Sequence, residues 1–63
     1  MAIHYIPKNA GKVSVAASKI GTPLVRNNLT GKNKILIPCK TWEQAEELAR
    51  KINSGDHNGT VTA

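Results

Sequence analysis

The sequence predicts an α+β fold in which one amphipathic helix, at about residues 41–54, packs on one face of a small antiparallel sheet of three to four short strands. Three observations support this prediction: a helical spacing of apolar residues in 41–54, short apolar runs broken by proline and glycine before it, and one more short run after it. A helix that covers one face of a sheet is the economical arrangement for this order of elements. The chain has 63 residues, so we expect a single domain over residues 1–63.

The strand candidates are short segments that are rich in β-branched or alternating residues and bounded by turn-forming residues. Within the fourth of them, Ile35, Ile37 and Cys39 would share one face. Pro38 restricts that segment to an edge or a strand end, because proline cannot donate a ladder hydrogen bond. The pair of alanines in the second segment also allows a helical turn. In chain order the segments span residues 2–6, 13–17, 24–26, 34–39 and 60–62.

The helix prediction rests on several local signals that agree. Apolar residues repeat at the spacing of one buried face, which places the side chain of Trp42 in the core with the others. Thr41 is a suitable N-cap, Gln44 completes a capping-box pattern, and Gly55 is placed to end the helix in a left-handed conformation. The apolar residues of this face are Trp42, Ala45, Leu48, Ala49 and Ile52.

Charge is divided unevenly along the chain, whose net charge is +5. Residues 1–40 contain seven basic residues and no acidic one, whereas residues 41–63 contain four acidic residues against two basic ones. Such asymmetry indicates a surface that binds an anionic partner, although exposed lysines also serve solubility alone. The candidate binding residues are Lys8, Lys12, Lys19, Arg26, Lys32, Lys34 and Lys40.

We expect the basic residues to lie on the sheet face that the helix leaves open, or on the rim of that face, opposite an acidic helix. A one-residue change of strand register would exchange the two faces of the sheet. With regular alternation, the residues of the open face are Lys12, Ser14, Ser18, Lys34 and Lys40. A second candidate surface, suited to binding a protein, is the solvent side of the helix with Glu43, Glu46 and Glu47.

The sequence carries no recognisable catalytic, metal or cofactor site. Both Gly-Lys pairs lack the glycine five residues before the pair that a P-loop requires, and two distant histidines with a single cysteine are a poor metal set. A chain of this size also has little room for a deep pocket of roughly 300 Å³ or more. We therefore expect a protein that is not an enzyme and needs no cofactor or metal. Without a signal peptide or a membrane-spanning apolar run, we expect it in the cytoplasm, with no membrane partner.

Most modes of nucleic-acid recognition fit this sequence poorly. Only Tyr5 is a plausible stacking residue for bases, and the three glutamates of the helix would be repelled by phosphates in a major groove. Contact of lysine and arginine with phosphates remains, and this mode depends on salt and little on sequence. The first functional hypothesis is therefore a small basic binding module that engages nucleic acid, a nucleoprotein complex or an acidic protein surface.

In size, in its minimal sheet with one helix and in its lack of an active site, the chain resembles the very short accessory proteins of bacteriophages and mobile elements. These include anti-CRISPR proteins and small inhibitors of host polymerase. No motif carries the resemblance, so it transfers no residue roles. It implies the alternative function of a protein inhibitor that blocks a larger complex sterically, through a sheet edge or the acidic helix face. A third hypothesis is a homodimer, because so small a core gains stability by self-association.

Overall fold

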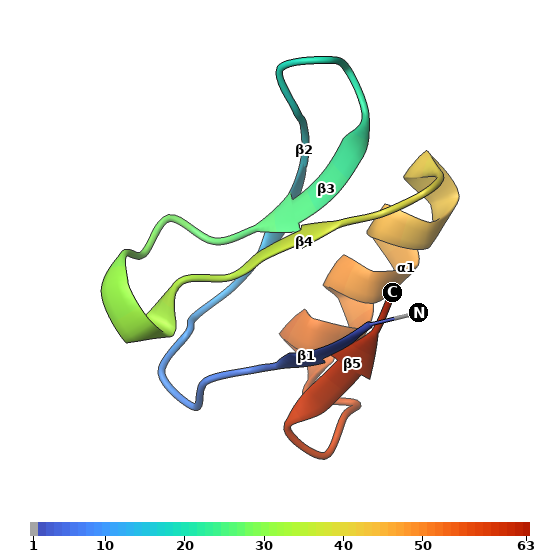
Figure 1. Ribbon diagram of the computed structural model, residues 1–63. Helices are drawn as coiled ribbons and strands as arrows, with labels where there is room; N and C mark the ends of the chain where they lie inside the picture. The colour runs from blue at the N-terminus through green and yellow to red at the C-terminus, as the bar shows by residue number, and fades with distance from the viewer. Residues whose placement is uncertain (1) are drawn as a thin grey trace.

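The computed structural model describes residues 2–63, and the predicted α+β class is confirmed (Figure 1). Each predicted strand segment contains a strand, and the helix begins one residue after its predicted N-cap. Within the described residues the elements are β1 (Ile3–Tyr5), β2 (Ser14–Ala17), β3 (Pro23–Arg26), a 3₁₀ turn at Gly31–Asn33, β4 (Leu36–Pro38), α1 (Trp42–Ser54) and β5 (Thr60–Thr62). No helix in this part of the chain is long and apolar enough to cross a membrane.

The strands form two antiparallel sheets rather than one. One sheet has the order β2-β3-β4, so β3 is central, and the other consists of β1 and β5 alone. The small sheet brings the two ends of the described chain side by side: Ala2 and Ala63 exchange backbone hydrogen bonds of 2.9 and 3.1 Å (Figure 1). The pairing of β1 with β5 joins segments far apart in the sequence, which local patterns do not reveal.

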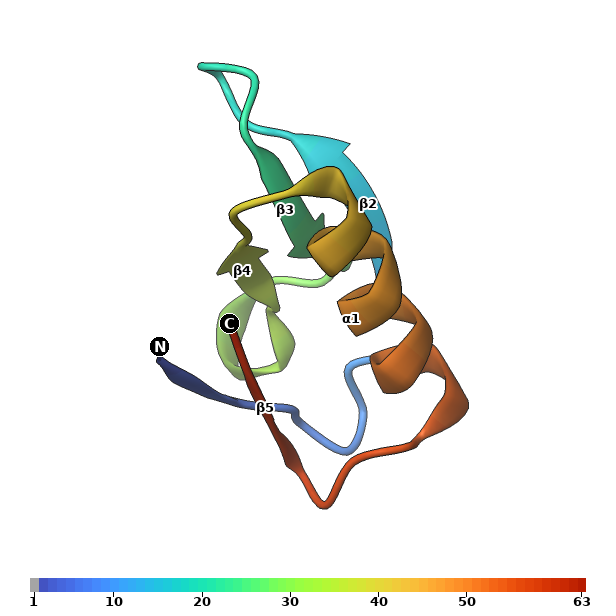
Figure 2. The same cartoon turned by 90° about the vertical axis from the view of Figure 1, so that its right-hand side faces the viewer.

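The core lies between α1 and the three-stranded sheet (Figure 2). Val15, Val25 and Ile37 stand in register across β2, β3 and β4, and Val25 and Ile37 are almost fully buried. Complete burial of such a side chain contributes about 1.5–3 kcal/mol to folding. The prediction that Ile35, Ile37 and Cys39 share one face is confirmed, since all three are buried. The helix contributes Ala45, Leu48, Ala49 and Ile52 to the same core.

Both ends of α1 are capped as predicted. The Oγ1 atom of Thr41 accepts the backbone N–H of Gln44 at 3.0 Å, and the side chain of Gln44 in turn accepts the N–H of Lys40 at 2.9 Å. At the other end Gly55 has a φ of 75°, in the left-handed region that glycine adopts without steric cost. These caps satisfy backbone groups that an isolated helix leaves unpaired.

The expectation that Trp42 belongs to the core was wrong, because its side chain is 46% exposed. Trp42 is the first residue of the helix and lies at the margin of the apolar stripe. Glu46 and Asn53, four and eleven residues after Trp42, lie on the same side of the helix. The small Ala45, by contrast, faces the sheet and has no exposed surface. Helical periodicity alone does not separate the centre of an apolar stripe from its margin.

Two asparagines hold irregular backbone segments in place. Asn27 is 6% exposed, and its side chain makes three hydrogen bonds to the backbone. Its Nδ2 donates to the carbonyl oxygens of Ala10 at 2.8 Å and Asn33 at 2.7 Å. Its Oδ1 accepts the backbone N–H of Ile35 at 2.8 Å. On the helix, Asn53 accepts the N–H of Val13 at 2.7 Å and donates to its carbonyl at 3.0 Å. These contacts anchor both loops to the core.

Candidate binding surface

The face of the three-stranded sheet that points away from α1 is built from two cross-strand rows. The first row is Ser14–Arg26–Leu36 and the second is Ala16–Leu24–Pro38. Because Val15, Val25 and Ile37 point toward the helix, strand alternation directs both rows to the opposite side. Leu36 is 53% exposed there.

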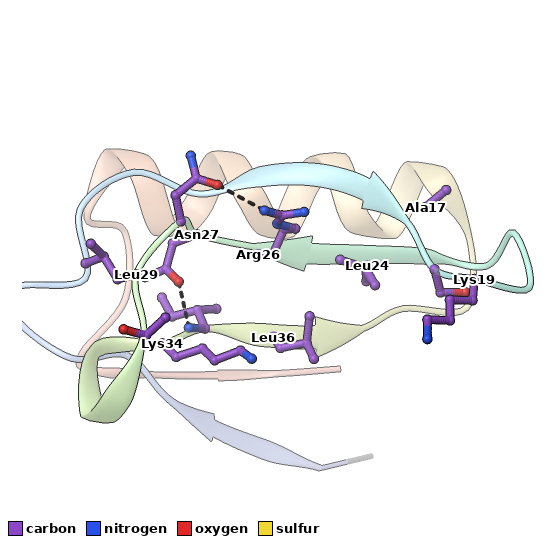
Figure 3. A pocket seen from close by; sticks show the side chains of 12 residues that line it. Ala17, Lys19, Leu24, Arg26, Asn27, Leu29, Lys34 and Leu36 are labelled. Atoms are coloured by element: carbon purple, nitrogen blue, oxygen red, sulfur yellow. Dashed lines mark hydrogen bonds between the residues drawn. The ribbon is translucent and has the colours of Figure 1, made fainter.

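A groove of about 500 Å³ runs along this open face and continues under the loop that follows β3. Leucines and cations line it together: Leu24 and Leu36 lie side by side on adjacent strands, with Lys34 at one end and Lys19 at the other (Figure 3). The volume exceeds the pocket size expected from chain length. The space is a surface groove, however, and Lys19, Arg26, Lys34 and Leu36 along it are all exposed. We call this surface the open-face groove; its main side chains are Lys19, Leu24, Arg26, Leu29, Lys34 and Leu36.

The cation in the middle of the open-face groove is held in place. The Nη2 atom of Arg26 donates to the Oδ1 atom of Asn28 at 3.1 Å (Figure 3). The loop that carries Asn28 and Leu29 is itself fixed by the buried Asn27 and its three hydrogen bonds. A guanidinium oriented in this way loses little side-chain freedom when it meets a carboxylate or a phosphate.

The structure brings together three of the seven predicted basic residues. All seven are exposed, but only Lys19, Arg26 and Lys34 line the open-face groove. Lys8 borders a different depression near the end of α1. Of the residues expected on the open face, Ser14 stands in its first row, and Ser18 and Lys34 line the groove. The other basic residues, which are exposed but do not line it, are Lys12, Lys32 and Lys40.

The acidic residues of the helix lie on the far side of the molecule from the groove. Glu43, Glu46 and Glu47 are exposed and border a shallow surface together with Arg50. In Figure 3 the helix runs behind the sheet whose front carries Arg26 and Lys34. The three groove cations and the three helix glutamates therefore lie on opposite sides of the sheet, which gives the molecule an electrostatic polarity.

The sequence analysis missed the leucines of the groove. A signal was present in β4: if Ile35, Ile37 and Cys39 point inward, then Leu36 between them must point outward, where a polar residue is usual. Leu24 follows by the same alternation, because its neighbour Val25 is fully buried. The outward rows of β3 and β4 therefore contain apolar residues as well as a charged one.

Two residues considered for base stacking or for thiol reactivity lie outside the groove. Tyr5, the only plausible stacking residue in the sequence, is 82% exposed but belongs to β1 in the other sheet. Cys39 is buried in the core, and burial raises the pKa of its thiol, so little of the reactive thiolate forms near neutral pH. No group of three or more metal-ligating side chains occurs within residues 2–63.

Comparison with known proteins adds no relative to this description. No protein-family model, no curated protein and no solved structure matches the chain.

Proposed function

We propose that this chain is a non-enzymatic binding module that uses the open-face groove to bind an acidic surface of a protein or of a nucleoprotein complex. The observation that supports this proposal is the mixture of side chains in the groove. Leu24 and Leu36 form an apolar centre, and Lys19 and Lys34 flank it at its two ends, with Arg26 between them. Apolar contact surrounded by charge is the composition of a protein-binding surface.

Magnitudes favour a partner that offers apolar groups as well as negative charge. Covering a leucine that is 53% exposed, such as Leu36, contributes on the order of 1 kcal/mol. An exposed ion pair contributes about 0–1 kcal/mol and mainly steers and orients the encounter. Phosphate groups would engage the cations but leave the leucines in water. An acidic protein surface with apolar side chains would engage both.

Nucleic acid is the second candidate, and a separate observation favours it. All seven basic residues of 1–40 are exposed, and no acidic residue lies among them in the sequence. A phosphate backbone is long enough to contact cations both inside and outside the groove. Binding of this kind would weaken steeply with salt, because each phosphate contact releases counterions.

A titration with three probes separates the two candidates: a synthetic peptide in which glutamate alternates with leucine, duplex DNA and single-stranded RNA. Each is measured at about 50 and about 200 mM salt. We expect the peptide to bind and Leu36→Gln to weaken its binding about tenfold, the ratio that corresponds to about 1.4 kcal/mol. Arg26→Gln should weaken it severalfold, and Lys8→Gln, which removes the same charge outside the groove, should have little effect.

The outcomes differ clearly between the candidates. Nucleic acid is the partner if three results are found together. Duplex DNA or RNA binds, Leu36→Gln does not weaken that binding, and Lys8→Gln and Arg26→Gln each reduce the salt slope of binding by about one. If none of the probes binds at the lower salt concentration, the groove is not a binding surface of either kind and the proposal is wrong.

The inhibitor hypothesis stays a prediction and is one form of this proposal. A small module that covers a partner's surface with one face blocks access to that surface. The acidic helix face on the other side would then point away from the partner or contact a second part of the complex. Changing Glu43 and Glu47 to lysine separates these cases, because only in the second should it weaken binding.

A further inference from the structure

The outer edge of β2 has backbone groups that point away from the sheet. The backbone N–H of Ser18 donates to the carbonyl oxygen of Thr22 at 2.8 Å, and this pair lies in the same register as β2 and β3. Hydrogen-bonded and non-bonded pairs alternate along an antiparallel ladder. Ser14 and Ala16 therefore bond to β3, whereas Val15 and Ala17 direct their N–H and C=O groups to the free edge. Pro23, which has no N–H, stands opposite Ala17 and fits this assignment.

One position of the same edge is already paired in the manner of a strand. Val13 follows the alternation of Val15 and Ala17, and the side-chain amide of Asn53 both accepts its N–H and donates to its carbonyl. A primary amide offers the same donor and acceptor as a peptide group. The edge thus has the geometry to receive a peptide backbone, and within residues 2–63 only Val13 of this edge is already paired.

The other edges of the two sheets are less suited to such pairing. On β4 the outward positions are Leu36 and Pro38, and proline offers no donor there. The strands β1 and β5 contain three residues each. The four residues of β2, Ser-Val-Ala-Ala, include neither proline nor a charged residue, the features with which proteins normally protect an edge strand.

We propose that the free edge of β2 accepts an extended, acidic segment of a partner protein as an added antiparallel strand. The charges beside this edge argue for an acidic occupant, because Lys12 precedes β2, Lys19 follows it, and both are exposed. They argue against a second copy of this chain. Two β2 strands paired about a two-fold axis would place Lys12 of one copy close to Lys19 of the other, and like charges at that position are destabilising. The proposal rests on the proposed function for its class of partner.

The two faces of β2 define the side-chain pattern of the added segment. Residues opposite Val15 and Ala17 would point to the helix side of the sheet. There α1 runs antiparallel to β2, so that the first turn of the helix lies toward the end of β2 (Figure 2). Trp42 in that turn is exposed. Glu46 is exposed on the same side of the helix, so side chains in this row must be apolar and not acidic. The alternate row points to the open face, toward Arg26. An alternation of acidic and apolar residues is therefore the matching pattern.

The test uses a synthetic peptide in which glutamate alternates with valine, the full chain, and a substitution that removes one outward donor. Ala17→Pro deletes the N–H of Ala17 without breaking a bond to β3, and its ring occupies the space of the incoming carbonyl. We expect this change to weaken peptide binding about tenfold or more. Ala17→Val is the comparison variant, because it changes the same side chain but keeps the N–H, and it should bind the peptide clearly more tightly than Ala17→Pro. In the complex, the amide hydrogens of Val15 and Ala17 should exchange more slowly with solvent.

Other results would overturn the proposal. If Ala17→Pro retains its fold by circular dichroism and binds the peptide as tightly as Ala17→Val, strand addition at β2 does not occur. If Leu36→Gln still weakens binding in that case, the open-face groove remains the binding surface and the proposed function survives. If sedimentation shows a dimer that Ala17→Pro dissociates, the occupant of the edge is a second copy of this chain and not an acidic segment.

Discussion

Replacing Asn27 by aspartate tests the polar contacts that hold the groove loop. The amide donates to the carbonyl oxygens of Ala10 and Asn33, and a carboxylate cannot donate to either. Two buried carbonyls would lose their partners at about 1–3 kcal/mol each, so Asn27→Asp should cost about 2–6 kcal/mol at neutral pH. A chain of 63 residues has a total stability of roughly 3–9 kcal/mol. The variant should therefore lie close to its unfolding transition.

The loss should depend on pH with a definite sign. Burial and the two facing carbonyl oxygens raise the pKa of the introduced carboxyl above its ordinary value of about 3.9. At a pH between the ordinary pKa and the raised pKa, the folded state binds more protons than the unfolded state, so the free energy of unfolding falls as pH rises. Below the ordinary value the carboxyl is protonated in both states and can donate one hydrogen bond, so part of the loss is recovered.

Urea unfolding followed by circular dichroism, at about pH 4 and about pH 7, measures both effects. Asn28→Asp is the matched control, because Asn28 is exposed and its Oδ1 acceptor for Arg26 is retained. The control should stay within about 0.5 kcal/mol of the unchanged chain. Equal stability of the two variants at neutral pH would refute the role given to Asn27.

Three further predictions concern the helix and the core. Gly55→Ala should cost about 1 kcal/mol in urea unfolding because it forces a side chain into a left-handed conformation, and a neutral result would contradict the capping described. Trp42→Ala should cost clearly less than the 3–5 kcal/mol of a buried tryptophan, as measured by circular dichroism; a loss within that range would mean that Trp42 is buried in solution. Cys39 should react with iodoacetamide far more slowly in the folded chain than in urea, because burial raises the pKa of its thiol, and fast alkylation of the folded chain would contradict this burial. For the same reason, the free energy of unfolding should decline as pH rises past the ordinary pKa of a thiol.

Local signals in the sequence predict the elements of this fold well. Thr41, Gln44 and Gly55 mark the ends of α1 because capping depends on neighbours within one turn. The inward row of Ile35, Ile37 and Cys39 follows from alternation alone. The division into two sheets does not follow, because the pairing of β1 with β5 depends on contacts across almost the whole chain.

The binding surface was only partly predictable. Arg26 and Lys34 were candidates by charge, but charge alone does not distinguish them from Lys32 or Lys40, which are also exposed and lie outside the groove lining. Strand register decides which cations meet, and the register depends on buried contacts such as Val25 with Ile37. Asn27 lies in a turn-rich segment, and nothing in such a segment shows that one of its amides will be buried.

The sheet of β1 and β5 has a consequence for the order in which the protein is made. During synthesis β1 emerges before the other described elements, and β5, the strand with which it pairs within residues 2–63, emerges after them. Closing so long a loop carries an entropic cost, which β2, β3 and β4 reduce if they have already folded against α1. On the ribosome, the helix and the three-stranded sheet can therefore assemble while the backbone groups of β1 still lack their strand partner. Among the described strands, β1 is then synthesised first and paired last.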